Sequence, residues 1–425
     1  MMDEGAAIEG LRRTEARLQE YAAKHGLVVR SEGWPGMPAP EQQQGPVRFA
    51  YWSVAGKLPG GVAGRLRHQA AFGKTFGMNI AMQHTIMVCR IPESVGYIPM
   101  LSVRAEGLEP TLFYWAGDGR PREDVGGFES MELDRRYIVE VAKGTDQAWL
   151  RQLFPPSFID WLAANTPVDF GFRLDGGVFT CECPQYRGQH RADGEVDEEH
   201  LDLLAGAGGR AASRIRDEVL EEADTLEAGA NPDSAEAHRA RAGGRKHGRL
   251  LGLVMKLAGE GTDDSVREFG EKHGMEPRDA AEFHAGHIRL PLPGTATDVL
   301  QGPLPGSGRP GELAWLEFSS DVDMQRNYNA IVVEGELDLP SAWVDAEDVT
   351  VPGFGEGLPQ QALEQARAAG YGISTHGRKA CVYMQRPGAA GWPSGAEVEA
   401  FCTRASEIAE SLSGGPLKEP SGQMP

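Results

Sequence analysis

The chain has 425 residues and a formal net charge of −20, because 62 Asp and Glu outnumber 42 Lys and Arg. At about 100–200 residues per domain, this length predicts two or three domains, each able to bury a substantial core. The acidic excess argues against nucleic acid as a partner, since phosphates repel such a chain unless its basic groups gather in one place.

The first predicted element is an N-terminal helix over Ala6–Lys24. Leu11, Leu18 and Tyr21 fall at spacings of seven and three, which places them on one helix face. The helix should stop at Gly26, since the Lys-His pair before it suits the negative end of the helix dipole and glycine readily turns left-handed. We interpret the histidine of that pair as a helix-end residue rather than a catalytic one.

A basic segment follows this helix. Between residues 42 and 92 there is no acidic residue, yet the segment contains aromatic rings, glycines and six cations: Arg48, Lys57, Arg65, Arg67, Lys74 and Arg90. In so acidic a chain this segment predicts an anion-binding surface, with Lys57, Arg65, Arg67 and Lys74 as candidates. The alternative is a solvated strand edge whose cations guard against aggregation.

Strands and a hairpin are predicted in the rest of the first half. The expected elements are strands at Asn79–Ile91, ended by Pro92, and at Ile98–Val103, Thr111–Trp115 and Tyr137–Val141, and a helix around Trp149–Trp161. Asp169–Leu174 and Val178–Cys181 flank Asp175-Gly176-Gly177, which is a strong hairpin signal. A helix over Asp197–Leu220 should close this half.

Residues 223–262 are predicted to form a charged helical linker. The part Arg239–Lys256 contains basic residues and no acid, whereas Asp193–Glu227 before it is strongly acidic. Two interpretations stay open: the basic part pairs with the acidic helix, or it makes a peripheral contact with anionic lipid. No apolar run approaches the roughly 20 residues needed to cross a bilayer, so no transmembrane segment is expected.

The second half repeats features of the first. Tyr21–Gly26 reads YAAKHG, and Phe269–Gly274 reads FGEKHG at the end of a helix predicted from Asp264. The same 248 positions separate Pro92 from Pro340, which follows a predicted strand over Asn329–Leu339.

A hairpin around His376-Gly377 is expected next, only 201 positions after its first-half counterpart, so the second copy should lack 47 residues. A helix over Ser394–Leu412 should follow it. Leu292-Pro293-Gly294 resembles Leu58-Pro59-Gly60 of the first copy.

These patterns predict an α+β protein with two tandem, diverged copies of one antiparallel-sheet unit. Each copy should pack its N-terminal and C-terminal helices on the sheet, and the second copy should be shorter. The expected boundaries are residues 1–222 and 263–413, with a disordered tail over 414–425.

No catalytic or cofactor motif is complete. Gly73-Lys74-Thr75 lacks the earlier glycine of a phosphate loop, and Gly60-Gly61-x-x-Gly64 follows no buried strand. Cys181, Cys183, His190 and His200 offer zinc-ligand chemistry, but the two cysteines alternate like one face of a buried strand. His284-x-x-His287 lacks a third ligand. We therefore expect no metal and no cofactor.

Five cysteines, scattered and odd in number, favour a reducing compartment, and the acidic start disfavours a secretory signal. A cytoplasmic location follows as the expectation. The leading functional hypothesis is a non-enzymatic binding or adaptor protein that contacts another protein. The alternative is an enzyme or small-ligand protein that holds an anionic substrate on the basic segment 48–90.

Three stretches resemble a family of proteins common in high-GC actinobacteria. They are Phe154–Leu162, Phe170–Gly177 and Ala211–Ile215, and they consist mainly of packing and turn residues. The family has no established activity, so the resemblance implies no site residues. It covers the first half of the chain at most.

Overall fold

The computed structural model describes residues 4–31, 40–43, 47–75, 78–97, 100–106, 122–125, 130–142, 150, 153–183, 196–223, 262–318, 326–386 and 394–412. The chain is α+β and divides into two compact units. The first contains residues 1–227 together with Val351–Gly353, and the second contains the remainder. Thr111–Trp115, the linker segment Arg239–Lys256 and the tail lie outside the described residues.

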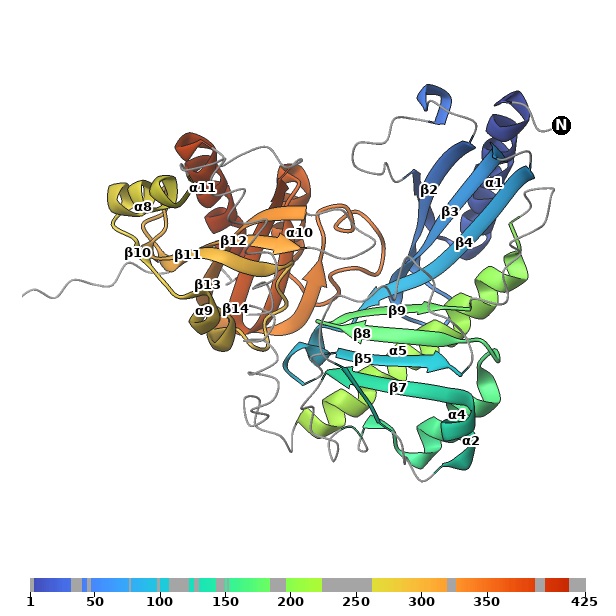
Figure 1. Ribbon diagram of the computed structural model, residues 1–425. Helices are drawn as coiled ribbons and strands as arrows, with labels where there is room; N and C mark the ends of the chain where they lie inside the picture. The colour runs from blue at the N-terminus through green and yellow to red at the C-terminus, as the bar shows by residue number, and fades with distance from the viewer. Residues whose placement is uncertain are drawn as a thin grey trace, which may run out of the picture. The chain divides into compact units, whose positions relative to one another are not determined.

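The first unit is built on one antiparallel sheet of nine strands in the order β1-β2-β3-β4-β9-β8-β5-β7-β6 (Figure 1). The strands are β1 (Val28–Ser31), β2 (Val47–Lys57), β3 (Ala63–Thr75), β4 (Met78–Arg90), β5 (Met100–Ala105), β6 (Arg122–Asp124), β7 (Tyr137–Ala142), β8 (Gly171–Asp175) and β9 (Val178–Glu182). Short helices η1 (Pro40–Gln42) and η2 (Pro92–Gly96) precede β2 and follow β4.

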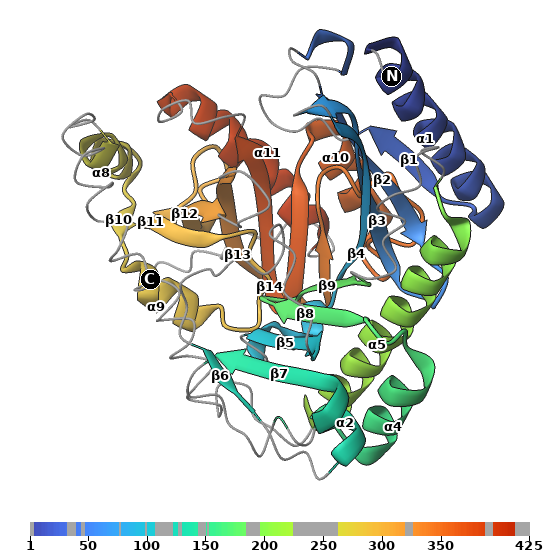
Figure 2. The same ribbon diagram turned by 45° about the vertical axis from the view of Figure 1, so that its right-hand side comes forward.

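Helices cover one face of this sheet. The long helices are α1 (Glu4–His25), which packs on β2 and β3, and α5 (Glu198–Ala223), which packs on β4 and β9 (Figure 2). The shorter helices are α2 (Met131–Arg136) and α4 (Pro156–Asn165). Leu18 and Tyr21 of α1 are fully buried, as their spacing predicts. The predicted helix around residues 149–161 is observed in part: Leu150 and Leu153 are helical, and α4 begins at Pro156.

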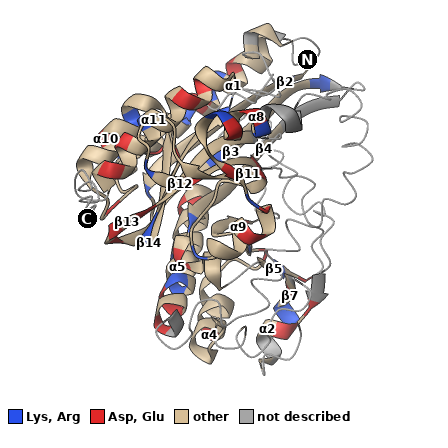
Figure 3. Cartoon of the chain, turned by 90° about the vertical axis from the view of Figure 1, so that its left-hand side faces the viewer, with Lys and Arg blue, Asp and Glu red and all other residues tan. Residues whose placement is uncertain are grey.

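The second unit has five antiparallel strands in the order β10-β11-β12-β13-β14. They are β10 (Glu276–Pro277), β11 (Thr295–Pro303), β12 (Pro310–Phe318), β13 (Arg326–Val344) and β14 (Gly372–Arg386). The helices are α8 (Thr262–His273), α9 (Ala280–Gly286), α10 (Gln360–Ala369) and α11 (Gly395–Leu412). Acidic and basic residues alternate with uncharged ones along the ribbons of α1, α5 and α11 (Figure 3).

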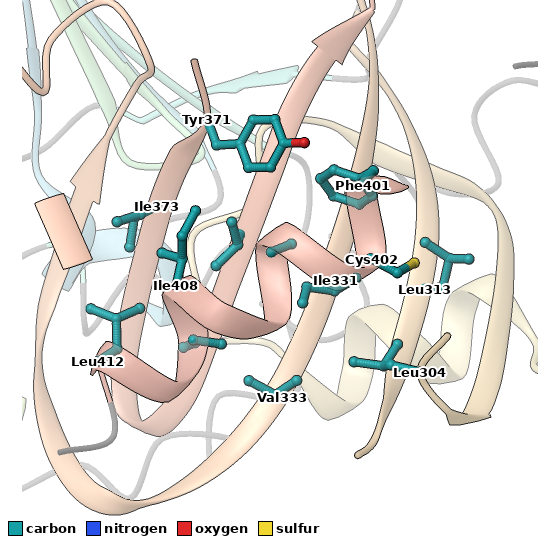
Figure 4. Close-up of a cluster of buried hydrophobic side chains, with 14 of the residues drawn as sticks. Leu304, Leu313, Ile331, Val333, Tyr371, Ile373, Phe401, Cys402, Ile408 and Leu412 are labelled. Carbon is teal, nitrogen blue, oxygen red and sulfur yellow. The ribbon is translucent and has the colours of Figure 1, made fainter. Parts of the chain in front are cut away.

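The core of the second unit lies between the sheet and its terminal helices. Ile408 and Leu412 of α11 meet Ile331 and Val333 of β13 there, and Phe269 of α8 joins the same cluster (Figure 4). At about 25 cal/mol per Å² of apolar surface removed from water, such burial is the main favourable contribution to folding. The predicted packing of the terminal helices on the sheet is therefore observed in this unit as well.

Five neighbouring strands of the first sheet and all five of the second have the same spatial order. In the first unit a helix leads into β1, β2, β3, β4 and β9, and α5 follows β9; in the second, α8 leads into β10 to β14, and α11 follows. Neighbours in both sets are antiparallel and in the same order. The four remaining strands of the first sheet, β5 to β8, have no strand counterpart among the described residues of the second.

Local geometry at the helix ends also agrees between the units. Tyr21 and His25 stack with ring centroids 4.5 Å apart at 41°, and Phe269 and His273 show the same 4.5 Å and 41°. Gly26 and Gly274 both have φ of 67°. The left-handed ending predicted from the Lys-His-Gly sequences is thus confirmed in both helices.

Each helix end is tied to the terminal helix of its own unit. His25 lies 3.2 Å from Asp202 of α5, and His273 lies 3.0 Å from Glu399 of α11. The Lys preceding each histidine reaches an acid on that helix too, Glu198 in the first unit and Glu399 in the second. Both units therefore connect their first and last helices by the same kind of polar contact.

The first-unit sequence Leu58-Pro59-Gly60 corresponds to Leu304-Pro305-Gly306 in the structure. Gly56 and Gly302, with φ of 151° and 153°, each precede it by two residues. Gly60 lies against α5, and Gly306 lies against Thr403 of α11. The predicted match to Leu292-Pro293-Gly294 is therefore wrong; that sequence precedes β11.

Two details of the second-half prediction are also wrong. Pro340 does not follow a strand, because β13 runs on to Val344 past a register shift at which the proline is tolerated. No hairpin forms at His376-Gly377, because β14 is continuous there. The first-half hairpin, by contrast, forms as predicted between β8 and β9.

Candidate protein-docking edge

The predicted anion-binding residues are divided between the two faces of the first sheet. Arg65 pairs with Ala55, and Lys57 pairs with Ala63, so the alternation of side chains places Lys57, Arg65 and Arg67 on one face. Arg65 is 6% exposed. These three residues do share a surface.

Lys74 lies apart from them. It stands on the opposite face of β3, the face of the buried Phe72, and nine residues along the strand from Arg65. At roughly 3.3 Å per residue, about 30 Å of strand separates the two cations. One pocket shared by Arg65, Arg67 and Lys74 is therefore not formed. Anion binding by the other three stays a prediction.

Cys181 and Cys183, the predicted thiol candidates, are buried on the face of β9 that packs against α5, and His200 of α5 is half-buried. All five cysteines are free and buried. Burial raises the pKa of Cys89 to about 12, so that thiol stays protonated near neutral pH. His190 lies outside the described residues, and among the described residues no group of three ligands could hold a metal ion.

The edge of β9 is covered in the first unit. The chain reverses at Gly176 and Gly177, with φ of 57° and 81°, and β8 returns along the outer side of β9. Phe172 and Leu174 of β8 are fully buried opposite Cys181 and Phe179. The sheet then continues through β5, β7 and β6. The first unit thus extends past β9 with its own chain.

The corresponding strand of the second unit, β14, ends its sheet. Among the described residues β14 has a strand neighbour on one side only, β13. The register aligns Ile331 with Val382 as it aligns Met87 with Cys181, so Ala380–Tyr383 of β14 occupies the place of Phe179–Glu182. In the described part of the second unit, no strand lies on the edge that β8 covers in the first.

The chain paths of the two units diverge at a glycine that occupies the same position in each unit. Gly377 has φ of 56°, close to the 57° of Gly176. Before Gly377, residues Ile373–Thr375 pair with the extension of β13 at Ala342–Val344. In the first unit β4 ends at Arg90 and the chain enters η2, so no extension exists for the equivalent strand to follow. The second unit therefore runs straight where the first folds back.

Gly377 also shifts the side-chain alternation of β14. Ile373 before it and Ala380 and Val382 after it all belong to the helix-side core. The alternation must therefore slip by one residue at Gly377 and Arg378, as at a β-bulge. In consequence His376 and Lys379 lie on the same face, the one away from the core.

This face of the second sheet carries a polar network with the segment around α9. The Lys379 ammonium donates to the carbonyl of Gly286, and Ser374 Oγ donates to the carbonyl of Pro291. His376 Nδ1 lies 2.6 Å from Ser341 Oγ. The first two contacts hold the α9 segment against β14, and the third joins β14 to β13.

A buried ionic cluster lies beneath the same segment. The Glu312 carboxylate of β12 contacts Arg278 and His287, which flank α9. Glu312 follows Gly311 as Arg65 follows Gly64, and both glycines pair with the matching glycine of the preceding strand. An acid that anchors α9 in one unit thus takes the place of an arginine in the other.

Burial, and then neighbouring cations, lower the pKa of several basic groups around this face. Burial, then Arg289 and Lys379, lower the pKa of His376 against the opposing effect of Asp338. Burial lowers the pKa of Lys379, and Arg278 adds to that effect while Glu334 opposes it. Burial, Lys379 and Arg278 lower the pKa of His287 to about 3. An anion placed here would relieve this repulsion.

Comparisons with protein families, curated proteins and solved structures find no match for this chain. The resemblance to actinobacterial proteins therefore stays a prediction. In the described part of the chain, no helix is both long and apolar enough to span a membrane.

Sequence reasoning missed the free edge and the basic group on β14. The signal was present, since Gly372–Arg386 contains three cations and no acid. It was obscured because a hairpin was expected at His376-Gly377.

Proposed function

We propose that the protein is a non-enzymatic binding protein that accepts an extended segment of another polypeptide on the outer edge of β14. The observation that carries the proposal is the absence of a covering strand beside β14 in the described sheet, at the edge that β8 occupies in the first unit. An exposed strand edge presents unpaired N–H and C=O groups, and adding a strand to it is a recurring mode of protein recognition.

The first unit indicates what such an edge accepts. Its β8 binds β9 as an antiparallel strand, with Phe172 and Leu174 on the core side and Gly171, Arg173 and Asp175 on the other. An incoming segment should have the same alternation. We propose in addition that the two units descend from one duplicated unit, which the common strand order and the paired helix-end contacts support.

The test uses a displayed library of short random peptides selected on the full-length protein. We expect enriched peptides with alternating apolar residues, and we expect their binding to slow amide hydrogen exchange at Ala380–Arg386. Enrichment without protection of β14, or no enrichment at all, would refute strand addition at this edge.

Adjacent proline substitutions supply a matched pair. In an antiparallel ladder, neighbouring residues direct their N–H groups to opposite sides, so only one of Met384 and Gln385 donates to β13. One of the two variants M384P and Q385P should destabilise the sheet. The fraction of that variant that stays folded should still bind the peptide. The other keeps its ladder to β13 and should weaken binding at least several-fold. Because the Met384 side chain packs against the core, M384A measures the stability that M384P loses with that side chain. Equal effects of the two variants on binding would contradict the proposal.

We retain a cytoplasmic location as part of the proposal, supported by five free, buried cysteines.

A further inference from the structure

We infer that the segment accepted by β14 carries an acidic side chain directly opposite Lys379. This inference rests on the proposed strand addition and specifies the chemistry of the partner. It follows from the equivalence of the two strand edges and from the charge of β14.

The position opposite Lys379 can be read from the first unit. Asp175 is the last residue of β8 and pairs with Val178 of β9. In the common register Val178 corresponds to Lys379, since Phe179 corresponds to Ala380. A strand added to β14 as β8 is added to β9 would therefore place its Asp175 counterpart beside the Lys379 ammonium.

The balance of charge in the first unit shows why an acid is needed there. Asp175 does not meet a cation on β9, and its carboxylate instead lies 2.9 Å from Arg173 of its own strand. In the second unit the cation is on the receiving strand. Cross-strand pairs of opposite charge stabilise a sheet, and like charges directly opposite destabilise it.

The surroundings of Lys379 reinforce this preference. His376 lies on the same face of β14. Burial lowers its pKa, and the nearby cations Arg289 and Lys379 lower it further. Burial lowers the pKa of Lys379, and the positive charge of Arg278, which precedes α9, adds to this effect. The opposing acids are Glu334, which pairs with Arg378 at 3.7 Å, and Asp338. Lys379 is only half-buried, so a carboxylate on an added strand can reach it.

The experiment extends the peptide selection to charge. Enriched peptides should contain Asp or Glu at one fixed position relative to their apolar residues. Replacing that acid by its amide should weaken binding to the full-length protein about ten-fold in fluorescence polarisation. The same loss is expected for intact peptide with K379M, and the amide peptide should bind wild type and K379M alike.

The control variant is K272M, which removes an exposed lysine that contacts Glu399 on α11. It should leave binding of the acidic peptide unchanged. An equal loss for K272M and K379M would mean that overall charge, and not the Lys379 position, attracts the peptide.

The possible failures are distinguishable. Peptides that protect β14 but bind K379M and wild type equally would overturn the acidic requirement and leave strand addition intact. Peptides that never protect β14 would overturn both proposals together. Protein stability measured in urea shows whether K379M is folded, and K379R offers a second variant that keeps the positive charge and should keep binding.

Discussion

The two units treat the same strand edge in opposite ways. In the first, the chain turns back at Gly176 and covers β9 with β8; in the second, it passes through Gly377 and leaves β14 at the end of the sheet. Both glycines have nearly the same positive φ. The difference teaches that this backbone conformation does not decide between a hairpin and a bulge. The length of the neighbouring strand decides it, 13 residues in β4 against 19 in β13.

The largest expected effect breaks the cover of the first unit. F172A removes a fully buried ring from β8 and should lower the free energy of unfolding of the first unit by about 3–5 kcal/mol. Hydrogen exchange should accelerate in β9 and α5 and stay unchanged in β13. The control V168A alters a side chain that is 78% exposed and should change little. Equal acceleration in both units would show that they do not unfold separately.

The next effect concerns the packing of the terminal helices. A Cβ on Gly208 of α5 would overlap the sulfurs of Cys181 and Met87. Ala405 of α11 stands six residues after Glu399, as Gly208 stands six after Asp202, and it is fully buried. We expect G208A to cost about 1–3 kcal/mol by overpacking. The reverse change A405G should cost about 1 kcal/mol, since glycine weakens a helix. Urea unfolding of each variant measures both. A stabilising G208A would contradict the described packing of α5.

A smaller effect compares the two glycines directly. G176A and G377A should each cost about 1–2 kcal/mol, because an L-residue is strained in the left-handed conformation. A Cβ on Gly377 meets no atom closer than 3.5 Å, so strain alone accounts for the cost there. G377N should be milder, as asparagine tolerates this conformation. Thermal unfolding measures the series. A neutral G377A would mean that β14 is not bulged at this residue.

The effect that is smallest near neutral pH is a pH dependence present in both units. Burial, with contributions from His84 and His200, lowers the pKa of His68 to about 3, and the pKa of His287 is likewise lowered to about 3. The unfolded histidines bind protons near pH 6.5, so the folded state loses stability progressively as the pH falls from about 6.5 toward 3. H68Q should flatten this dependence in the first unit only. Urea titrations at several pH values, followed by hydrogen exchange, provide the check. An unchanged slope in H68Q would contradict it.

The elements with local signals were predictable from the sequence. Both Lys-His-Gly helix ends, the β8–β9 hairpin and the terminal helices follow from dipole, glycine and periodicity rules that act within a few residues. The path of the chain at Gly377 was not predictable, because a glycine with positive φ suits a turn as well as a bulge. The bulge forms because the extension of β13 past Pro340 pairs with Ile373–Thr375. Proline usually marks a strand end, and here it lies at an irregularity in the ladder.

The candidate site was less accessible to prediction for the same reason. Arg278 and His287 contact Glu312 from a different part of the chain, and no sequence spacing predicts these contacts. Arg65 and Lys74 lie on opposite faces because side chains alternate along a strand, and this could be predicted once β3 was recognised as one continuous strand. Grouping cations by nearness in sequence ignored that alternation.

The charge of β14 has a consequence for the protein when no ligand is present. A strand edge with unpaired N–H and C=O groups can pair with the same edge of another copy, which leads to aggregation. Arg378, Lys379 and Arg386 lie on β14, which contains no acid, so two such edges paired antiparallel around Val382 would place Arg378 of each copy opposite Arg386 of the other. We therefore expect these side chains to disfavour edge-to-edge association between copies of the protein.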